Sequence, residues 1–160
     1  MDKFDIHQRF VDVLKGELAA ITASAKDSFA TATSEAHHAE GKYDTFSLES
    51  SYLARGQAKR VAELADALEL FQLLPLKSLD DTSKVQRGAL VRLEADDGET
   101  RTVYFGPAAG GEEISVDDET IIVLTSSSPL GAAILGKSTG DTFNLKMGID
   151  TQSYTVTSVQ

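Results

Sequence analysis

The chain has 160 residues, 41% of them hydrophobic, and it contains no cysteine. This length accommodates one ordinary domain or two small ones, and the hydrophobic fraction excludes a chain that is disordered throughout. Without cysteine there are no disulfides or thiolate metal sites. No apolar run reaches the ~18 residues of a membrane span, so we expect a cytoplasmic protein without membrane contact. The formal net charge of −10 argues against binding to a nucleic-acid duplex and favours protein partners with basic surfaces.

Apolar residues in the first half recur at spacings of three and four, and no proline interrupts residues 4–74. This pattern is typical of amphipathic helices that pair through a coiled-coil seam. The segment 33–45, TSEAHHAEGKYDT, is polar and separates two such stretches. We therefore predict that residues 1–75 form an antiparallel α-helical coiled-coil hairpin with its tip at about 33–45. We expect its base to be held together by Leu14, Leu18, Leu64, Leu68 and Phe71.

After a short linker at 76–83, the hydrophobic period changes from helical to alternating. Val, Ile, Thr, Tyr and Phe are concentrated in segments that predict strands at 84–94, 101–105, 120–125, 141–147 and 153–159. A short helix is predicted at 129–135, because the serines before Pro129 can cap it and Gly136 can end it. These elements predict a small α+β domain over residues 84–160.

The stretch 114–143, ISVDDETIIVLTSSSPLGAAILGKSTGDTF, resembles the C-terminal domain of the Gre transcript-cleavage factors. That family has a Ser-Pro-[Ile/Leu]-Gly/Ala-x-Ala-[Leu/Ile]-[Leu/Ile]-Gly-Lys-x-x-Gly-Asp pattern there. The matching residues are Ser128, Pro129, Leu130, Gly131, Ala133, Ile134, Leu135, Gly136, Lys137, Gly140 and Asp141. The order of the parts, helical hairpin first, also agrees with the family, so the resemblance covers nearly the whole chain.

The resemblance implies an FKBP-like C-terminal domain that docks at the rim of the secondary channel of bacterial RNA polymerase. It implies that the hairpin enters the channel and touches the RNA 3′ end or DNA only within that complex. It implies a monomer that is no enzyme by itself and has no cofactor of its own, any Mg²⁺ being shared with the polymerase. The implied docking residues are Ser128, Pro129, Leu130, Gly131, Leu135, Gly136, Lys137, Gly140 and Asp141.

The tip departs from the family. The family tip reads Gly-Asp-x-x-Glu-Asn-Ala-Glu-Tyr, and alignment on Tyr43 places Ala36 and Ala39 at the two carboxylate positions. In the family these carboxylates help to hold a second metal ion, which a methyl group cannot do. We therefore expect a channel-binding regulator with weak or no stimulation of transcript cleavage. The alternative is true cleavage stimulation by displaced carboxylates, for which the candidates are Glu35, Glu40 and Asp44.

Other polar residues of the hairpin have competing interpretations. His37 and His38 are adjacent and therefore diverge on a helix, which favours solvated side chains over a metal site. By resemblance, Arg55, Lys59 and Arg60 are the basic residues that face the RNA 3′ end. The alternative for them is an ordinary solvated face on which Glu63 pairs with Lys59 at the i, i+4 spacing.

A function of another class, prolyl isomerisation, is compatible with an FKBP-like fold but needs an aromatic-lined pocket. The C-terminal half has no Trp, and we expect the core to use its aromatic residues, which are Tyr104, Phe105, Phe143 and Tyr154. No nucleophile set or phosphate-binding glycine loop is present in the sequence.

Overall fold

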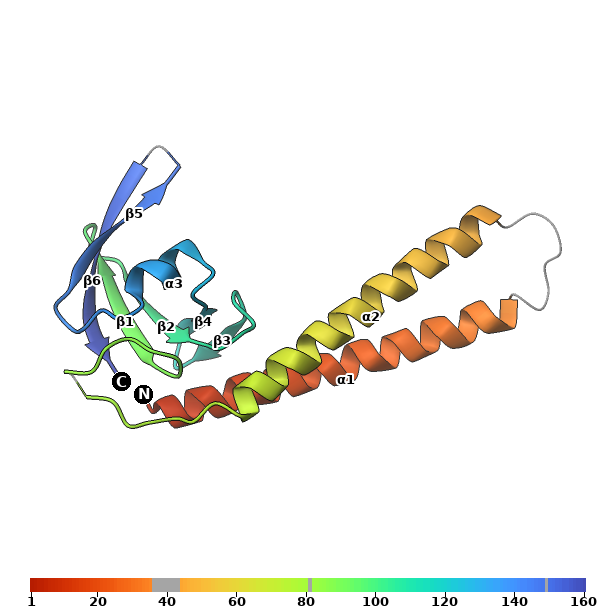
Figure 1. Cartoon of the computed structure of the whole chain (residues 1–160), viewed down its shortest axis with the longest axis horizontal. Helices are drawn as coiled ribbons and strands as arrows, with labels where there is room; N and C mark the ends of the chain where they lie inside the picture. Colours follow the sequence, from red (N-terminus) through yellow and green to blue (C-terminus); the bar gives the residue numbers. More distant parts are fainter. Residues whose placement is uncertain (36–43, 81, 149) are drawn as a thin grey trace. The chain divides into compact units, whose positions relative to one another are not determined.

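The structure, a computed structural model, describes residues 1–35, 44–80, 82–148 and 150–160. Two long helices, α1 (Lys3–Glu35) and α2 (Asp44–Gln72), precede a sheet and one short helix (Figure 1). The remaining elements are β1 (Leu90–Ala95), β2 (Thr100–Phe105), β3 (Glu113–Val116), β4 (Glu119–Leu124), α3 (Pro129–Ile134), β5 (Thr142–Met147) and β6 (Asp150–Val159). The predicted α+β class, a helix pair followed by a β-rich domain, is confirmed.

The chain packs as two compact units. One unit is the hairpin segment Asp12–Glu69, and the other combines Met1–Val11 with Leu70–Gln160. The first turns of α1 and the last residues of α2 therefore fold with the sheet. The predicted division into a hairpin (1–75), a linker (76–83) and a docking domain (84–160) stays a prediction.

Six strands form one mixed sheet in the order β3-β4-β2-β1-β6-β5. All neighbours are antiparallel except β2 and β4, whose parallel register pairs Thr102 with Ile121 and Tyr104 with Val123. Because side chains alternate between the faces of a strand, this register places Leu90, Tyr104 and Val123 on one face. Val91, Val103 and Ile122 lie on the other.

The face that carries Val91 packs against α3, which lies over the sheet in Figure 1. Ile134 of α3 is fully buried there, and Leu130 is partly buried against the same cluster. The buried residues of this core are Val85, Ala89, Val91, Leu93, Ala95, Val103, Phe105, Leu124, Ile134, Tyr154, Val156 and Val159.

The opposite face of the sheet packs against the ends of α1 and α2 that belong to the same unit. Ring centroids of Phe10 and Phe71 lie 5.4 and 6.0 Å from that of Tyr104. A Cβ on Gly106 would lie 3.2 Å from Cζ of Phe71 and 2.6 Å from a methyl group of Val123. Gly106 thus leaves the space into which the Phe71 ring fits. This unit has three layers, with α3 on one face of the sheet and the helix ends on the other.

The described part of the hairpin unit has buried side chains near its base. Leu14 and Leu64 are buried, while Leu18 and Leu68 are only half-buried. An ion pair between Arg60 and Glu17, with 3.6 Å between nitrogen and oxygen, links the two arms. No described helix is long and apolar enough to cross a membrane.

Two strand predictions differ from the structure. The strand predicted at 84–94 begins only at Leu90, because Gly88 has a φ of +85° and Val85 is bonded to the loop after α3. Strand β3 was missed. It forms a hairpin with β4 through Asp117 and Asp118, whose φ angles are 50° and 62°. Such turns normally carry Asn or Gly, so an Asp-Asp pair gives a poor turn signal.

Candidate functional site

The segment that carries the family pattern begins with a capped helix. Ser128 has extended backbone angles, and its Oγ accepts a hydrogen bond from the backbone N–H of Gly131 at 3.0 Å. The same hydroxyl donates to the carbonyl of Thr125, also at 3.0 Å. Pro129 occupies the first helical turn, where its missing N–H costs no hydrogen bond. Ser-Pro at this position is therefore explained by the start of α3.

Glycines shape the rest of the segment. Gly131 is buried, and a Cβ there would lie 2.0 Å from the carbonyl oxygen of Thr125. Gly136, with a φ of +78°, ends the helix and donates its N–H to the carbonyl of Val85 at 2.9 Å. Gly140 has a φ of +90°, a backbone region that side chains rarely adopt. These positions need glycine for reasons of local structure.

Several side chains on this frame face the solvent at least in part, and three of them lie between the end of α3 and the start of β5. Leu135 is 49% exposed although it is large and apolar. Lys137 is half-buried, with Nζ 5.8 Å from the ring centroid of Phe143. Asp141 is exposed and accepts a hydrogen bond from the N–H of Ser138 at 2.8 Å. We call Leu135, Lys137 and Asp141 the α3–β5 surface. A surface with one apolar and two oppositely charged side chains can bind another protein.

The predicted tip candidates are only partly covered by the structure. Glu35 is the last residue of α1, and Asp44 is the first residue of α2. Glu40, His37, His38, Tyr43 and the two alanines, Ala36 and Ala39, lie outside the described residues. Among the residues that are described, no group of three or more His, Asp or Glu could hold a metal ion. The expected absence of tip metal ligands stays a prediction.

The three basic residues of α2 are not equivalent. Lys59 lies 3.7 Å from Glu63, the pairing that the i, i+4 spacing predicted. Arg60 pairs across the hairpin with Glu17, a contact that the sequence did not indicate. Arg55 is exposed and forms no ion pair with the described part of the chain. Exposed pairs contribute only ~0.2–1 kcal/mol, so all three cations remain accessible to a partner.

A buried aromatic cluster at the helix ends was not predicted from the sequence. His7 is 8% exposed, and its Nδ1 lies 2.6 Å from the hydroxyl of Tyr104. Burial lowers the pKa of His7, although a hydrogen bond to the backbone of Phe71 opposes that shift. Burial also raises the pKa of Tyr104. The seam, continued backwards from Leu14 in steps of four residues, could have indicated that Phe10 and Ile6 are buried, but not that His7 meets Tyr104.

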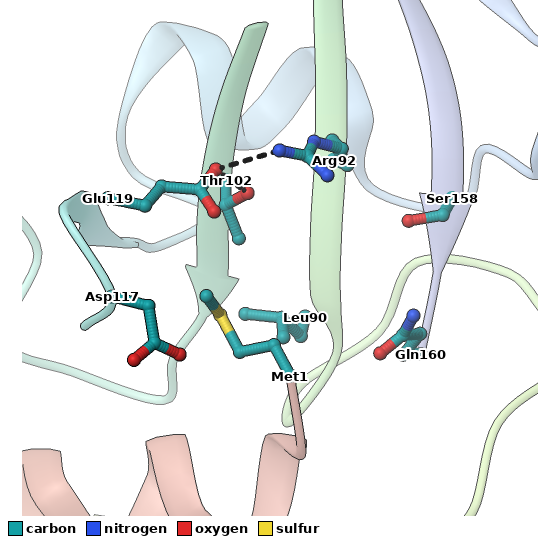
Figure 2. Close-up of a pocket in the computed structure, with 8 residues that line it drawn as sticks. All are labelled: Met1, Leu90, Arg92, Thr102, Asp117, Glu119, Ser158 and Gln160. Atoms are coloured by element: carbon teal, nitrogen blue, oxygen red, sulfur yellow. Dashed lines mark hydrogen bonds and ion pairs between the residues drawn. The ribbon is translucent and has the colours of Figure 1, made fainter.

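A hollow of about 290 Å³ opens on the sheet beside the N-terminus (Figure 2). Glu119 lines one side of it and accepts hydrogen bonds from Thr102 Oγ1 and from Arg92, the latter at 3.3 Å. These polar groups satisfy one another. The hollow is lined by Met1, Leu90, Arg92, Thr102, Asp117, Glu119, Ser158 and Gln160.

The aromatic residues that an isomerase pocket would need are packed elsewhere. Phe105 and Tyr154 are buried in the core under α3, and Phe143 stacks on Tyr154 at 5.5 Å between centroids. Tyr104 lies in the cluster on the opposite face. These four rings therefore line no pocket beside α3.

The sequence was compared with protein-family models, with known proteins and with solved structures. Residues 80–160 match the family model described as "Transcription elongation factor, GreA/GreB, C-term". The chain is 29% identical to a transcription elongation factor GreA of Sinorhizobium medicae over 101 residues, which span 63% of this chain and 60% of that protein. It is 26% identical over 165 residues to the GreA of Brucella canis, covering 100% of this chain and 99% of the relative.

A solved structure of the transcription factor Gfh1 is 18% identical, with a TM-score of 0.42 and coverage of 94% of this chain and 92% of the other. The family model spans half of the sequence, and it covers the whole α3–β5 segment. The chain therefore belongs to the GreA/GreB family of transcription elongation factors.

Proposed function

We propose that this protein binds bacterial RNA polymerase at the rim of its secondary channel, through the α3–β5 surface, and regulates transcription there. Family membership over residues 80–160 supports polymerase as the partner. The observation that carries the choice of surface is Leu135, which is 49% exposed on a frame fixed by a serine cap and two glycines. Burying such a side chain against a partner removes apolar surface from water, and a rigid support lowers the entropic cost of ordering it.

The protein acts in the cytoplasm as a monomer, with the hairpin inside the channel. Arg55, Lys59 and Arg60 then contact the RNA 3′ end, and they meet nucleic acid only within the complex. A net charge of −10 agrees with this restriction, because the free protein repels phosphates.

The regulator itself contributes little or no transcript cleavage. A second metal ion needs carboxylate oxygens at ~2.1 Å, and Ala36 and Ala39 provide none at the family's two positions. Any cleavage is performed by the polymerase, so the protein is not an enzyme. By occupying the channel without metal ligands, it acts as a competitor of cleavage-stimulating factors.

A competition assay tests this function. A backtracked elongation complex with Mg²⁺ is given a GreA protein, this protein, or both, and RNA shortening is measured. We expect no shortening with this protein alone, and slower GreA-dependent shortening as its concentration rises. The double variant Ala36→Asp with Ala39→Glu should itself gain cleavage stimulation.

The alternative, cleavage stimulation by displaced carboxylates, predicts a different result in the same assay. If the unmodified protein shortens the RNA, and Glu35→Ala, Glu40→Ala or Asp44→Ala abolishes that activity, displaced carboxylates hold the metal. If it neither shortens RNA nor slows the GreA reaction at saturating concentration, binding in the secondary channel is refuted.

A further inference from the structure

His7, Phe10, Phe71 and Tyr104 form a cluster that we call the aromatic seat. All four lie in the unit that contains the sheet, and all are buried. The His7 ring stacks on Phe71 with 5.6 Å between centroids, and Phe10 lies 6.3 Å from Phe71. The seat joins three elements, since His7 and Phe10 belong to α1, Phe71 to α2 and Tyr104 to β2.

Most contacts in the seat are not directional. Ring packing tolerates sliding and rotation, because dispersion depends on area and distance more than on angle. The hydrogen bond between His7 Nδ1 and the Tyr104 hydroxyl, at 2.6 Å, is different, because it requires one relative placement of the two atoms. Rotation of α1 by a single residue turns a side chain by ~100° and would break this bond.

His7 also connects to the second helix. Its ring stacks on that of Phe71 and forms the hydrogen bond to Tyr104, so one imidazole engages both α2 and β2. A neutral imidazole has one donor and one acceptor nitrogen, so Nδ1 can pair with the hydroxyl in either tautomer. A phenylalanine at position 7 could reproduce the stacking but not the hydrogen bond.

Phe71 is fixed on its far side as well. Because Gly106 has no side chain, there is room beside it for Cζ of Phe71, and a methyl group of Val123 bounds the same space. The position of the end of α2 on the sheet is therefore fixed by the fit of Phe71 beside Gly106. The position of the start of α1 depends on His7. Both helices continue without a break from the seat into the arms, up to Glu35 and from Asp44.

We propose that His7 and Tyr104 are positioning residues for the hairpin. Their hydrogen bond sets the rotation and register of α1 on the sheet, beyond what apolar packing provides, and the action of the hairpin in the polymerase channel depends on that register. The dependence of the hairpin's action on this register rests on the proposed function, whereas the register of α1 on the sheet does not. Neither residue touches the polymerase.

A variant set separates positioning from stability. Tyr104→Phe leaves a buried imidazole nitrogen without a partner, and His7→Phe leaves the buried hydroxyl unpaired, so each single variant is destabilised. In the double variant His7→Phe with Tyr104→Phe, both polar groups are gone and the rings remain. Replacing both partners by apolar groups of similar shape is nearly neutral, so the double variant should fold almost as well as the parent.

The conformational readout uses paired spin labels. The chain has no cysteine, so Asp5→Cys on α1 and Glu94→Cys on β1, both exposed and both in the unit that contains the sheet, give one specific pair. Double electron–electron resonance then measures the distribution of distances between them. We expect a single narrow distribution in the parent and one at least about twice as wide in the double variant. An unchanged width in a folded double variant overturns the positioning role, because apolar packing would then suffice.

The functional readout uses the same double variant with core RNA polymerase. We expect its binding to stay within about twofold of the parent, because the α3–β5 surface is untouched. We expect its suppression of GreA-dependent cleavage to fall about tenfold. Suppression at the parental level refutes the dependence on register. If the parent itself fails to bind polymerase, the proposed function is wrong, and the spin-label widths alone decide the positioning role.

Discussion

The α3–β5 segment and the hairpin arms are stabilised in different ways. In the former, almost every residue of the family pattern has a local structural reason, from the cap of Ser128 to the turn at Gly140. Among the arm residues whose burial is described, the fully buried side chains lie near the base, where an ion pair between exposed side chains also links the arms. A family pattern can thus identify a fold through residues that shape it, and the docking surface proposed above uses the exposed side chains.

The largest effect should follow from filling the space at Gly131. Gly131→Ala places a methyl group 2.0 Å from the backbone oxygen of Thr125, which cannot move aside as a flexible side chain would. We expect a loss on the order of 4 kcal/mol in the free energy of unfolding, at the upper end for overpacked sites. Gly136→Ala meets no atom within 4 Å and should cost only ~1 kcal/mol through its positive φ. Urea denaturation of both variants checks the difference, and equal losses would contradict it.

A smaller effect is expected in the hairpin. Leu64 is 3% exposed, so Leu64→Ala should lower the free energy of unfolding by ~2–4 kcal/mol. Leu68, which is half-buried, should lose roughly half as much on the same substitution, and Ala36→Ser or Ala39→Ser well under ~1 kcal/mol. Thermal unfolding measures all four. Equal losses at Leu64 and at the tip would show that the base does not hold the hairpin.

The pH dependence of stability should reveal His7. Its pKa is lowered by burial, so the folded state binds fewer protons than the unfolded state. The contribution of His7 to the free energy of unfolding is fully present above its unfolded pKa of 6.5 and is lost as the pH falls below that value. The slope reaches at most ~1.4 kcal/mol per pH unit. Denaturation at pH 7.5 and pH 5.5 should show a smaller loss in the double variant His7→Phe with Tyr104→Phe. An identical loss in both proteins would contradict the assignment, because groups other than His7 would then account for it.

Much of this fold could be predicted from the sequence. The 3–4 spacing around Leu14 and Leu64 indicated the helix pair, and the serines before Pro129 with Gly136 behind indicated α3, because these signals are local. Strand β3 escaped because its turn uses Asp117 and Asp118 at positive φ instead of glycine. The aromatic seat escaped for another reason. His7 and Tyr104 are 97 residues apart, and no local pattern predicts which polar side chains meet across a sheet.

Two leucines allow the central claim to be tested with a matched control. Leu135 on the α3–β5 surface is 49% exposed, and Leu70 near the end of α2 is 48% exposed. Removal of either side chain to alanine exposes little new surface, so stability should change equally little. The full chain is needed, because a fragment of residues 84–160 would uncover Leu90, Tyr104, Ile121 and Val123, which are at most 4% exposed.

The measurement is the dissociation constant of each full-length variant for bacterial core RNA polymerase at physiological salt. If the α3–β5 surface docks on polymerase, Leu135→Ala should weaken binding roughly tenfold, equivalent to ~1.4 kcal/mol, and Leu70→Ala should change it less than about twofold. Equal affinities for the two variants, or a larger loss at Leu70, would contradict the proposed docking surface.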